Sequence, residues 1–536
     1  MIEIPDFIVV GSGCTGAMAA QTLVESGRTV LLLDGGLQEK RYQSLIPDAD
    51  FIKIRKNDPQ QHRYFLGDHY EGVPLGKIKT GEHLTPPRKF MTALTETFLP
   101  VLSDNFMPLE SLAYGGLGNG WGLGCCIFSD EELRACTLPE AEMKAAYQVV
   151  ADRIGISGCN DDAAPYTAGK LPLQAPIQMD SNGKRLYSKY QKHRGQLNAR
   201  GFYLGRPSLA LITQEKNGRK PYQYKDLDFY DDQDESAYRP WITINALLKK
   251  NNFSFIGDML VLSYQENSDG VEVHCISISN QSKHSFKAKK LVLCPGVLGT
   301  ARIVLRSHQS LGTALPLLCN PYSYLPCLQP LLLGKDNDPF KIGFAQLSLF
   351  YDPQQNNFDV GMASIYSYRS MMAFHILKET PMGVRDAYTF LKYMMPAFTI
   401  IGLHHSESQH PDKWVKLNAT KNEIGQLEVN YPLSDQQRLK IAHTEKQYAG
   451  ALRRLQCFVL KNIEPQMGAS IHYAGTLPQN APNEKFRLSS NGKLGQTQHV
   501  YVADGSGFTY LPAKGLTFSL MANAHRVAVH ALQEAM

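Results

Sequence analysis

The sequence predicts an α/β fold combined with an α+β unit: a strand–turn–helix–strand unit of the Rossmann type begins the chain, and a part with the pattern of an antiparallel sheet lies further along it. Three observations support this. An apolar run over residues 6–10 is followed at once by a glycine turn and a helical segment. A strand and a helix close the chain from residue 500 onward, and segments between residues 311 and 479 alternate apolar and polar residues.

The bulk composition is that of a soluble globular protein with more than one domain. The chain has 536 residues, 43% hydrophobic and 20% charged, and this length predicts two or three domain-sized units. The net charge of +5 comes from 55 Lys and Arg against 50 Asp and Glu. Because no dense basic run is present, nucleic-acid binding is not predicted.

The cysteines and the apolar segments of the sequence indicate in which cellular compartment the protein is expected. The ten cysteines are scattered and form no zinc-type spacing, so no metal site is expected and reduced thiols indicate a cytoplasmic protein. The fold signal begins within the first ten residues, which argues against a signal peptide. The most apolar segment, residues 388–405, contains Lys392 and Pro396. We expect a helix and a strand lining a pocket, or at most a membrane-touching surface, and no transmembrane segment.

The N-terminal unit reads strand, glycine turn, helix, strand. Gly11 permits the turn, Gly13 lets the backbone approach a pyrophosphate, and Gly16 allows close helix–strand packing. Asp34 ends the second strand, 18 positions after Gly16, where a carboxylate can bind the adenosine ribose. The unit predicts a dinucleotide, FAD or NAD, held by Gly11, Ser12, Gly13, Cys14, Thr15, Gly16, Asp34 and Gly35.

The C-terminal unit favours a flavin. The strand VYVAD ends at Asp504, which can bind ribityl hydroxyls, and an amphipathic helix runs from Leu516 to the terminus. The N-terminus of that helix can stabilise negative charge on a reduced flavin ring. The alternative is a strand and helix that only complete the sheet.

At this point the sequence resembles the glucose–methanol–choline (GMC) oxidoreductase family of flavoproteins. Four segments carry the likeness: VVGSGCTGAMAA with LLLDGG, SLAYGGLGNGWGLGCCIFSDEEL, LVLCPGVLGTARIVLRS, and SIHYAGT with VADGS and LTFSLMANA. The second is closest to the pyranose-oxidase-like and polysaccharide-cluster branches. The resemblance implies a discontinuous Rossmann-type FAD-binding domain (1–133, 242–310 and 480–536). It also implies an inserted antiparallel-sheet substrate-binding domain (134–241 and 311–479).

The resemblance also implies further FAD contacts. It places the glycine-dense segment 115–124 beside the isoalloxazine ring, although a tight loop packed under the sheet would have a similar composition. Gly120 stands where some relatives carry a covalently bound His, so non-covalent FAD is expected. The further implied contacts are Gly115, Gly116, Gly118, Asn119, Gly120, Leu260, Gly505, Gly515, Leu516 and Thr517.

The implied catalytic residue is His472, in SIHYAGT, because a neutral imidazole can accept the hydroxyl proton of an alcohol. The family's second active-site residue, His or Asn, is replaced here by Gly515, preceded by Lys514. Lys514 either supplies a cation at the flavin edge or is a solvated side chain.

For the substrate, Tyr366, Arg369 and His404 are candidate pocket residues, with packing or surface roles as the alternative. His404 and His405 are adjacent on a strand, so at most one should line the cavity. The aromatic and acidic segment 222–241 is interpreted as a mobile lid or a surface loop.

Three functions remain open. The first is FAD-dependent oxidation of a small-molecule hydroxyl, with O₂, a quinone or a carrier protein as electron acceptor. The second is an elimination, cyclisation or C–C cleavage on the same scaffold, suggested by Gly515. The third is a non-enzymatic binding protein, against which His472 and both flavin-type strands argue.

Overall fold

The computed structural model gives the arrangement of most of the chain. The described residues are 4–73, 84–232, 234–336, 338, 342–367, 381–420, 423–479, 481 and 483–534.

A five-stranded parallel sheet, in the order β21–β9–β1–β2–β5, joins segments from both ends and the middle of the chain. Every residue of β1 is buried, as expected for a strand with helices on both sides. The strands are β1 (Phe7–Val10), β2 (Val30–Leu33), β5 (Phe253–Ile256), β9 (Lys290–Leu293) and β21 (Val500–Val502). The predicted N-terminal order of strand, turn, helix and strand is present.

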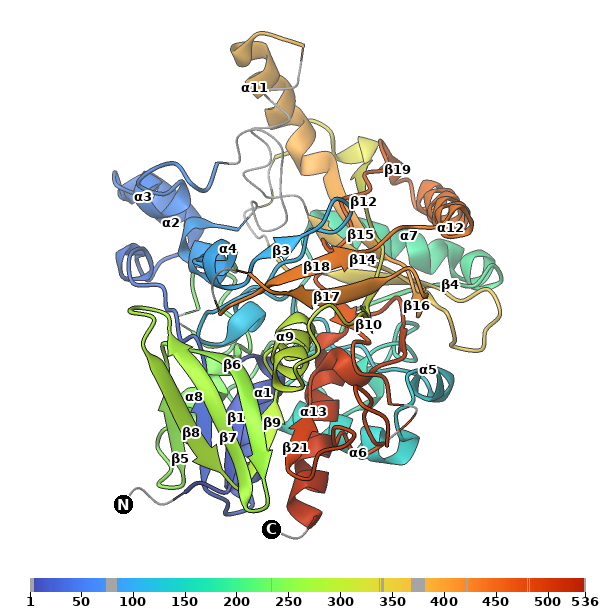
Figure 1. Cartoon of the computed structure of the whole chain (residues 1–536). Helices are drawn as coiled ribbons and strands as arrows, with labels where there is room; N and C mark the ends of the chain where they lie inside the picture. The colour runs from blue at the N-terminus through green and yellow to red at the C-terminus, as the bar shows by residue number, and fades with distance from the viewer. Residues whose placement is uncertain are drawn as a thin grey trace.

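Two helices contact this sheet, and two more pack against them. α1 (Cys14–Glu25) contacts both α13 (Thr517–Gln533) and α8 (Pro240–Leu247), and α13 also contacts α6 (Glu140–Ile154). The C-terminal helix α13 begins at Thr517, one residue after the start that the sequence predicts. Figure 1 shows α13 and α9 (Val297–Ser307) near each other beside the sheet, although they are far apart in sequence.

A three-stranded antiparallel sheet is attached to one side, formed by β6 (Met259–Asn267), β7 (Gly270–Ser277) and β8 (Lys283–Ala288). The turn predicted at residues 268–270 connects β6 and β7. Helix α9 packs against β6, which holds the start of this hairpin near the edge of the parallel sheet.

The predicted antiparallel layer is a six-stranded sheet in the order β19–β12–β15–β14–β13–β4. Helices α7 (Ser181–Asn198) and α12 (Asp435–Arg454) cover one face and bury residues such as Tyr190 and Tyr448 with it. Alternation along each strand leaves the opposite face for a cavity. The strands are β4 (Phe202–Gly205), β12 (Tyr322–Leu328), β13 (Leu347–Tyr351), β14 (Gly361–Ser367), β15 (Phe398–His404) and β19 (Phe458–Val459).

Smaller sheets connect the layers. One has the order β10–β17–β18–β3, and the pairs β11–β20 and β16–β22 join the middle of the chain to its C-terminal part. Their bounds are β3 (Val101–Leu102), β10 (Leu315–Pro316), β11 (Leu318–Cys319), β16 (Glu407–Ser408), β17 (Trp414–Asn418), β18 (Gln426–Asn430), β20 (Tyr473–Ala474) and β22 (Tyr510–Leu511).

The remaining elements are short. They are α2 (Phe51–Asn57), α3 (His62–Phe65), α4 (Thr95–Phe98), α5 (Asp130–Ala135), α11 (Val384–Met394), and the 3₁₀ turns η1 (Gln43–Leu45), η2 (Pro86–Thr92), η3 (Gly116–Asn119), η4 (Ala168–Lys170), η5 (Pro330–Leu332), η6 (Met395–Ala397) and η7 (Gly505–Gly507).

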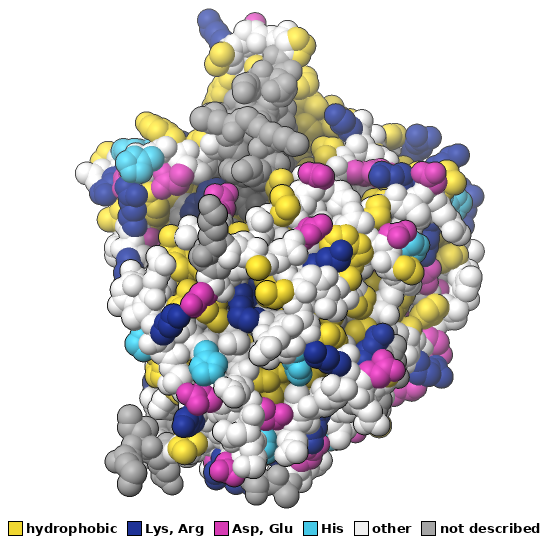
Figure 2. All heavy atoms as spheres, in the orientation of Figure 1, with side chains coloured by type: hydrophobic (Ala, Val, Ile, Leu, Met, Phe, Trp, Pro, Cys, Tyr) yellow, Lys and Arg dark blue, Asp and Glu magenta, His cyan; other side chains and the backbone are white. Residues whose placement is uncertain are grey.

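The apolar segment 388–405 divides into the end of α11, the turn η6 and the strand β15. Figure 1 shows α11 standing away from the body of the molecule, and its Tyr388 and Tyr393 are exposed. Among the described residues, no helix has both the length and the apolar character needed to cross a membrane. On the face in Figure 2, Lys and Arg side chains are interspersed with Asp and Glu instead of forming one patch.

Candidate active site

A cavity of about 450 Å³ lies where the parallel strands end and the six-stranded sheet begins. Its walls include Gly11 after β1, Asp34 after β2, Cys294 after β9 and Asp504 after β21. The carboxyl ends of strands in an open parallel sheet are where ligands of such sheets bind. The same cavity reaches the far sheet at His404.

A second hollow, of about 640 Å³, lies at the surface between β6–β8 and the β17–β18 connection. It is lined by side chains such as Lys283 and Glu423, and it shares Leu262 and Arg306 with the first cavity. None of the predicted site residues that the structure describes lines it. We therefore locate the candidate site in the 450 Å³ cavity.

The N-terminal glycine turn leaves room for a ligand at one position only. Gly11 has φ +96°, and a Cβ there would be 2.6 Å from the Cys294 carbonyl oxygen. A Cβ on Gly16 would overlap the carbonyl oxygen of Gly11. A Cβ on Gly13 would meet no described protein atom within 4 Å, and Gly13 lines the cavity. Gly11 and Gly16 are thus required for packing, and Gly13 keeps space open in the cavity.

Three helices begin at this cavity. Gly13 precedes α1, Gly296 precedes α9 and Leu516 precedes α13, and all three line the cavity. The residues that precede these helices supply no side-chain cap of their own, and at α9 the backbone N–H of Gly296 donates to the Asp504 carboxylate. The positive ends of the three helix dipoles therefore lie at the cavity, where they favour an anionic ligand. A pyrophosphate-containing dinucleotide fits this arrangement.

The two predicted carboxylates are held by the protein. Asp34 accepts hydrogen bonds from the Ser12 and Gly36 N–H groups, at 2.8 and 2.7 Å, and burial raises its pKa to about 6. Asp504 accepts one from the Thr300 hydroxyl at 2.6 Å and two from Ser506. A carboxylate oxygen has more than one acceptor site, so both groups can still accept from a ligand hydroxyl.

The second glycine segment faces the first. The Gly115 N–H donates to Ser12 Oγ at 2.8 Å. Asn119 is 1% exposed and donates from Nδ2 to the carbonyls of Tyr114 and Gly116, at 2.9 and 2.8 Å. Its amide therefore folds the loop and does not line the cavity. The lining residues of this segment are Gly116, Leu117, Gly118, Gly120, Trp121, Gly122 and Gly124.

A cluster of buried charged side chains contacts the second glycine segment. Asp232 pairs with Arg88 at 2.6 Å and with Arg239 at 3.2 Å, all three almost without exposure. Arg239 also donates to the Trp121 carbonyl at 3.1 Å. Burial alone would raise the pKa of Asp232, but the two guanidinium groups hold it below its usual value. Asp232 and Arg239 are thus buried, and this part of segment 222–241 is neither a mobile lid nor a surface loop. Through Arg239 it supports the predicted cofactor loop.

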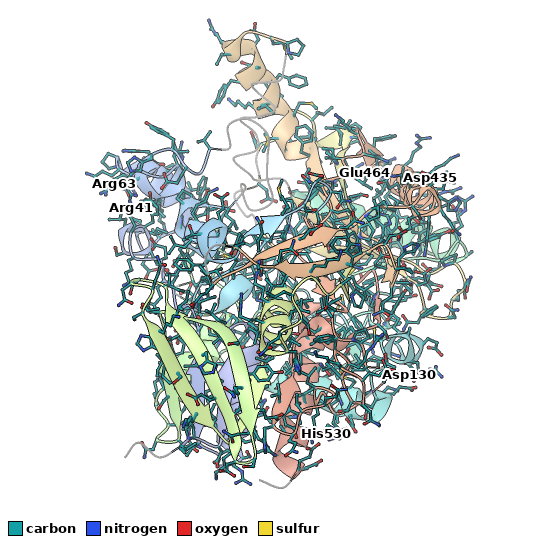
Figure 3. All side chains as sticks on the ribbon, in the orientation of Figure 1. Arg41, Arg63, Asp130, Asp435, Glu464 and His530 are labelled. Atoms are coloured by element: carbon teal, nitrogen blue, oxygen red, sulfur yellow. The ribbon has the colours of Figure 1, made fainter. Side chains whose placement is uncertain are left out.

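Replacing Asp232 with Asn is expected to lower the free energy of unfolding by about 3–5 kcal/mol, because two buried guanidinium groups would lose their counter-charge. Denaturant melts of the purified variant measure this. Asp68→Asn is the control. Asp68 pairs with Arg41 and Arg63, which lie at the periphery in Figure 3, so its loss should change stability little. Equal effects of the two changes would contradict the structural role of the cluster.

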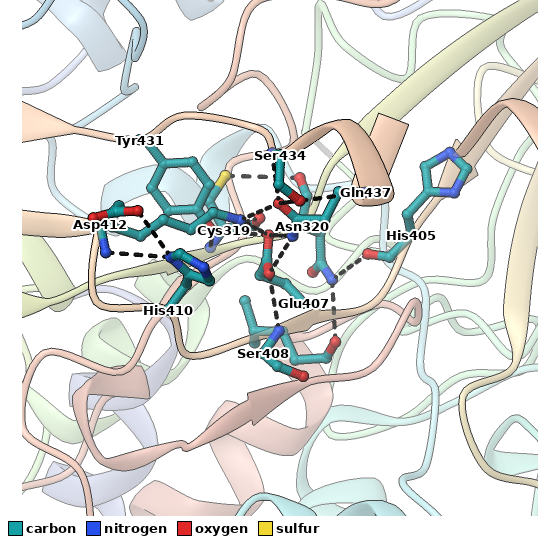
Figure 4. A network of polar contacts seen from close by, with 12 residues as sticks. Cys319, Asn320, His405, Glu407, Ser408, His410, Asp412, Tyr431, Ser434 and Gln437 are labelled. Carbon is teal, nitrogen blue, oxygen red and sulfur yellow. Dashed lines mark hydrogen bonds and ion pairs between the residues drawn. The ribbon is translucent and has the colours of Figure 1, made fainter. Parts of the chain in front are cut away.

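His472 is held by an asparagine from a distant part of the chain. Its Nδ1 is 3.2 Å from Asn320 Oδ1. The Asn320 Nδ2 donates to the carbonyls of His405 and Pro512, at 2.7 and 3.1 Å. Figure 4 shows the hydrogen bond from the Asn320 amide to the His405 carbonyl. Because only the nitrogen of the Asn320 amide can donate to these carbonyls, the amide oxygen of Asn320 must face His472.

This contact fixes the tautomer of His472. An amide oxygen only accepts, so Nδ1 carries the proton and Nε2 keeps a lone pair. Burial lowers the pKa of His472 to about 4. At neutral pH the ring is uncharged, and its basic nitrogen is the one that can meet a ligand in the cavity.

His404 and His405 lie on opposite sides of their strand. His404 lines the cavity, whereas His405 is buried elsewhere with Nε2 3.2 Å from Ser323 Oγ. The rings of His404 and His472 are stacked, with centroids 4.8 Å apart and planes 9° from parallel. Two imidazoles therefore share one wall of the cavity.

The rest of that wall comes from β13 and β14. Ser348, Met362, Ser364 and Tyr366 line the cavity, while the alternating residues of the same strands pack on α7 and α12. Predicted pocket residue Arg369 lies outside the described residues. The wall combines hydroxyl groups with a thioether.

Lys514 lies in neither of the expected environments. It is 0% exposed, so it is not solvated, and it does not line the cavity. Its Nζ is 2.7 Å from Glu132 Oε2. Burial raises the pKa of Glu132, and Lys514 partly offsets this. Lys514 therefore neutralises a buried carboxylate of α5, and the predicted catalytic role does not fit this position.

The predicted cofactor residues mostly gather in one place. Those that line the cavity are Gly11, Ser12, Gly13, Cys14, Thr15, Asp34, Gly35, Gly116, Gly118, Gly120, Leu260, Asp504, Gly505, Gly515, Leu516 and Thr517. Those that do not are Gly16, Gly115 and Asn119. A Cβ on Gly515 would be 3.3 Å from the Gly124 carbonyl oxygen, so close packing accounts for the small residue there.

The sequence alone does not reveal Asn320, Ser348 or the cluster of Arg88, Asp232 and Arg239. Asn320 follows a two-residue strand and carries no local motif. Asp232 and Arg239 lie in the aromatic and acidic segment 222–241, whose composition does not show that the two side chains are buried. Asn320 contacts His472, 152 positions away, and Arg88 completes the charge cluster from a distant segment, so neither role is visible locally.

Comparisons with known proteins support the fold. No protein-family model matches the sequence, and no curated protein matches it. The structure is similar to the crystal structure of pyridoxine 4-oxidase from Mesorbium loti, with a TM-score of 0.60 and 12% sequence identity. The alignment covers 99% of this chain and 100% of that chain. The whole chain thus has a mixed α/β architecture that an oxidase also has.

Proposed function

We propose that this chain is an FAD-dependent oxidoreductase that oxidises a hydroxyl group, with His472 as the base. The observation that carries the proposal is the fixed tautomer of His472, whose unprotonated Nε2 can meet a ligand in a cavity where three helices begin. The sequence resemblance to GMC oxidoreductases and the similarity in fold to an oxidase support the same assignment. We further propose the discontinuous domain division given above.

The residues present fit FAD. The open space and the helix start at Gly13 suit a pyrophosphate. Asp34 suits a ribose, and the helix start at Leu516 suits the ring of a reduced flavin. Leu260 lies at the cavity beside α9 and suits an adenine contact. When bound, FAD supplies the two-electron acceptor that takes the hydride of the alcohol carbon.

The protein's part in the reaction is to place the alcohol and take its proton. His472 Nε2 accepts the hydroxyl proton as the carbon–oxygen double bond forms, and Asn320 keeps the ring in the required tautomer. The imidazolium later returns the proton to solvent. Met362, Ser364 and Tyr366 form the wall against which the remainder of the substrate lies.

Product analysis tests this function against its alternative. The holoenzyme is incubated with pyridoxine, glucose, benzyl alcohol and decanol, with a reducible dye as electron acceptor. We expect an aldehyde or ketone in equal amount to the dye reduced. Turnover that yields an elimination, cyclised or cleaved product without dye reduction would favour the atypical reaction instead.

Acid precipitation should release all of the flavin. Gly120 offers no side chain for a covalent bond to the ring. We therefore expect the supernatant to hold one FAD per chain and the pellet to be colourless. A yellow pellet after washing would contradict non-covalent binding.

The pH dependence of kcat/KM should follow the protonation of His472. Since the base must be neutral, kcat/KM should be flat near neutral pH and fall about tenfold per unit below about pH 4, the pKa of this ring. In Asn320→Asp the carboxylate would stabilise the imidazolium and move this limb upward by one or more pH units. Circular dichroism at each pH serves as the folding control. A limb near pH 6.5 in the wild type would contradict the lowered pKa of His472, and a limb that stayed in place in Asn320→Asp would contradict His472 as its source.

A further inference from the structure

Two imidazoles from distant segments lie against each other on the cavity wall. His404 ends strand β15, and His472 lies directly before β20. Their stacking, with centroids 4.8 Å apart, places a second titratable ring beside the proposed base. The proposed reaction uses the ring of His472 alone.

The two nitrogens of His404 differ in their surroundings. Nδ1 is buried and has no hydrogen-bond partner in the part of the chain that the structure describes. Buried N–H groups without a partner are rarer in proteins than buried acceptors without one, and an unpaired N–H at this position would cost its desolvation penalty. The proton therefore belongs on Nε2, the ring nitrogen that can meet a ligand.

The two rings thus carry complementary tautomers. His472 is protonated at Nδ1 by its contact with Asn320 and has a lone pair at Nε2. His404 has its N–H at Nε2. Burial, followed by repulsion from His472 and His405, lowers the pKa of His404 well below its usual value. Neutral His404 is therefore a donor and neutral His472 an acceptor on the same wall.

We propose that His404 is a second catalytic residue of this site, which donates a hydrogen bond from Nε2 to the substrate oxygen whose proton His472 takes. The proposal rests on the proposed function. One oxygen can bond two nitrogens that lie up to about 6 Å apart, which the stacked rings allow. As the proton leaves, negative charge grows on that oxygen, and a donor fixed in advance stabilises it without reorganisation.

Three substitutions separate this function from a packing role. His404→Phe keeps a stacked ring but has no donor, and it should lower kcat about 10²-fold with unchanged FAD content. His404→Gln places an amide N–H near the position of Nε2 and should recover at least tenfold. His404→Asn reaches only toward Nδ1 and should not. Equal rescue by Gln and Asn, or a His404→Phe enzyme within twofold of wild type, would overturn the proposal.

A measurement without turnover tests the tautomer directly. Nitrogen NMR of the ¹⁵N-histidine-labelled holoenzyme at pH 7, assigned with His404→Gln and His472→Gln, reports which ring nitrogen is protonated. We expect Nε2–H for His404 and Nδ1–H for His472. A proton on Nδ1 of His404 would overturn the proposal. If the wild type oxidised none of the probe alcohols, the proposed function would fail, while this spectrum would still decide whether His404 is a donor.

Discussion

Replacing His472 with alanine is expected to lower kcat/KM by about 10²–10⁴-fold, the usual effect of losing a positioned general base. His472 is the imidazole whose lone pair is fixed by an identified contact, through Asn320. With the side chain gone, water must accept the hydroxyl proton. FAD content and melting temperature should stay near the wild-type values, because His472 lines the cavity and is not part of the glycine turns. Steady-state kinetics with the best probe alcohol measure the change.

The matched control is His443→Ala, which removes an exposed imidazole from α12. Its kcat/KM should equal that of the wild type. If the His472→Ala enzyme retained full activity with intact FAD, His472 would not be the base, whatever the cavity binds.

The second large effect concerns the cofactor: Gly13→Leu should yield a folded protein with almost no FAD. Gly13 has φ −65° and ψ −174°, which any residue adopts. A Cβ there meets no described protein atom within 4 Å. The new side chain would therefore enter the cavity without straining the turn, in the space assigned to the pyrophosphate. The FAD-to-protein ratio of the purified variant, with circular dichroism for folding, measures this.

Two further glycine changes give the contrast. Gly195 lies exposed in α7, and a Cβ there also meets no described atom, so Gly195→Leu should keep full FAD content. Gly16→Ala places a Cβ onto the Gly11 carbonyl and should impair folding itself. A Gly13→Leu protein with bound FAD would contradict the position of the site.

The features that the sequence predicted are those encoded locally. β1 and β2 flank a glycine turn whose order is visible in thirty residues. The start of α13 was predicted within one residue, since its apolar face repeats with the helical period. Alternation in β14 correctly indicated a sheet with one face on a cavity.

The features that it missed depend on contacts between distant segments. Asn320 reaches His472 only because β11 pairs with β20. His404 stacks on His472 because β15 ends at the cavity. Lys514 was misplaced since its buried partner, Glu132, lies 382 residues away. Such pairs leave no periodic or compositional pattern in the sequence.

Anaerobic mixing of the holoenzyme with the probe alcohols tests the central claim most directly. If the cavity holds FAD and His472 acts as base on a hydroxyl, at least one alcohol should bleach the visible flavin band fully in a single turnover. Bleaching should be slowed about 10²–10⁴-fold in His472→Ala. A purified protein that contains no flavin, or bleaching at the same rate in both proteins, would contradict the account.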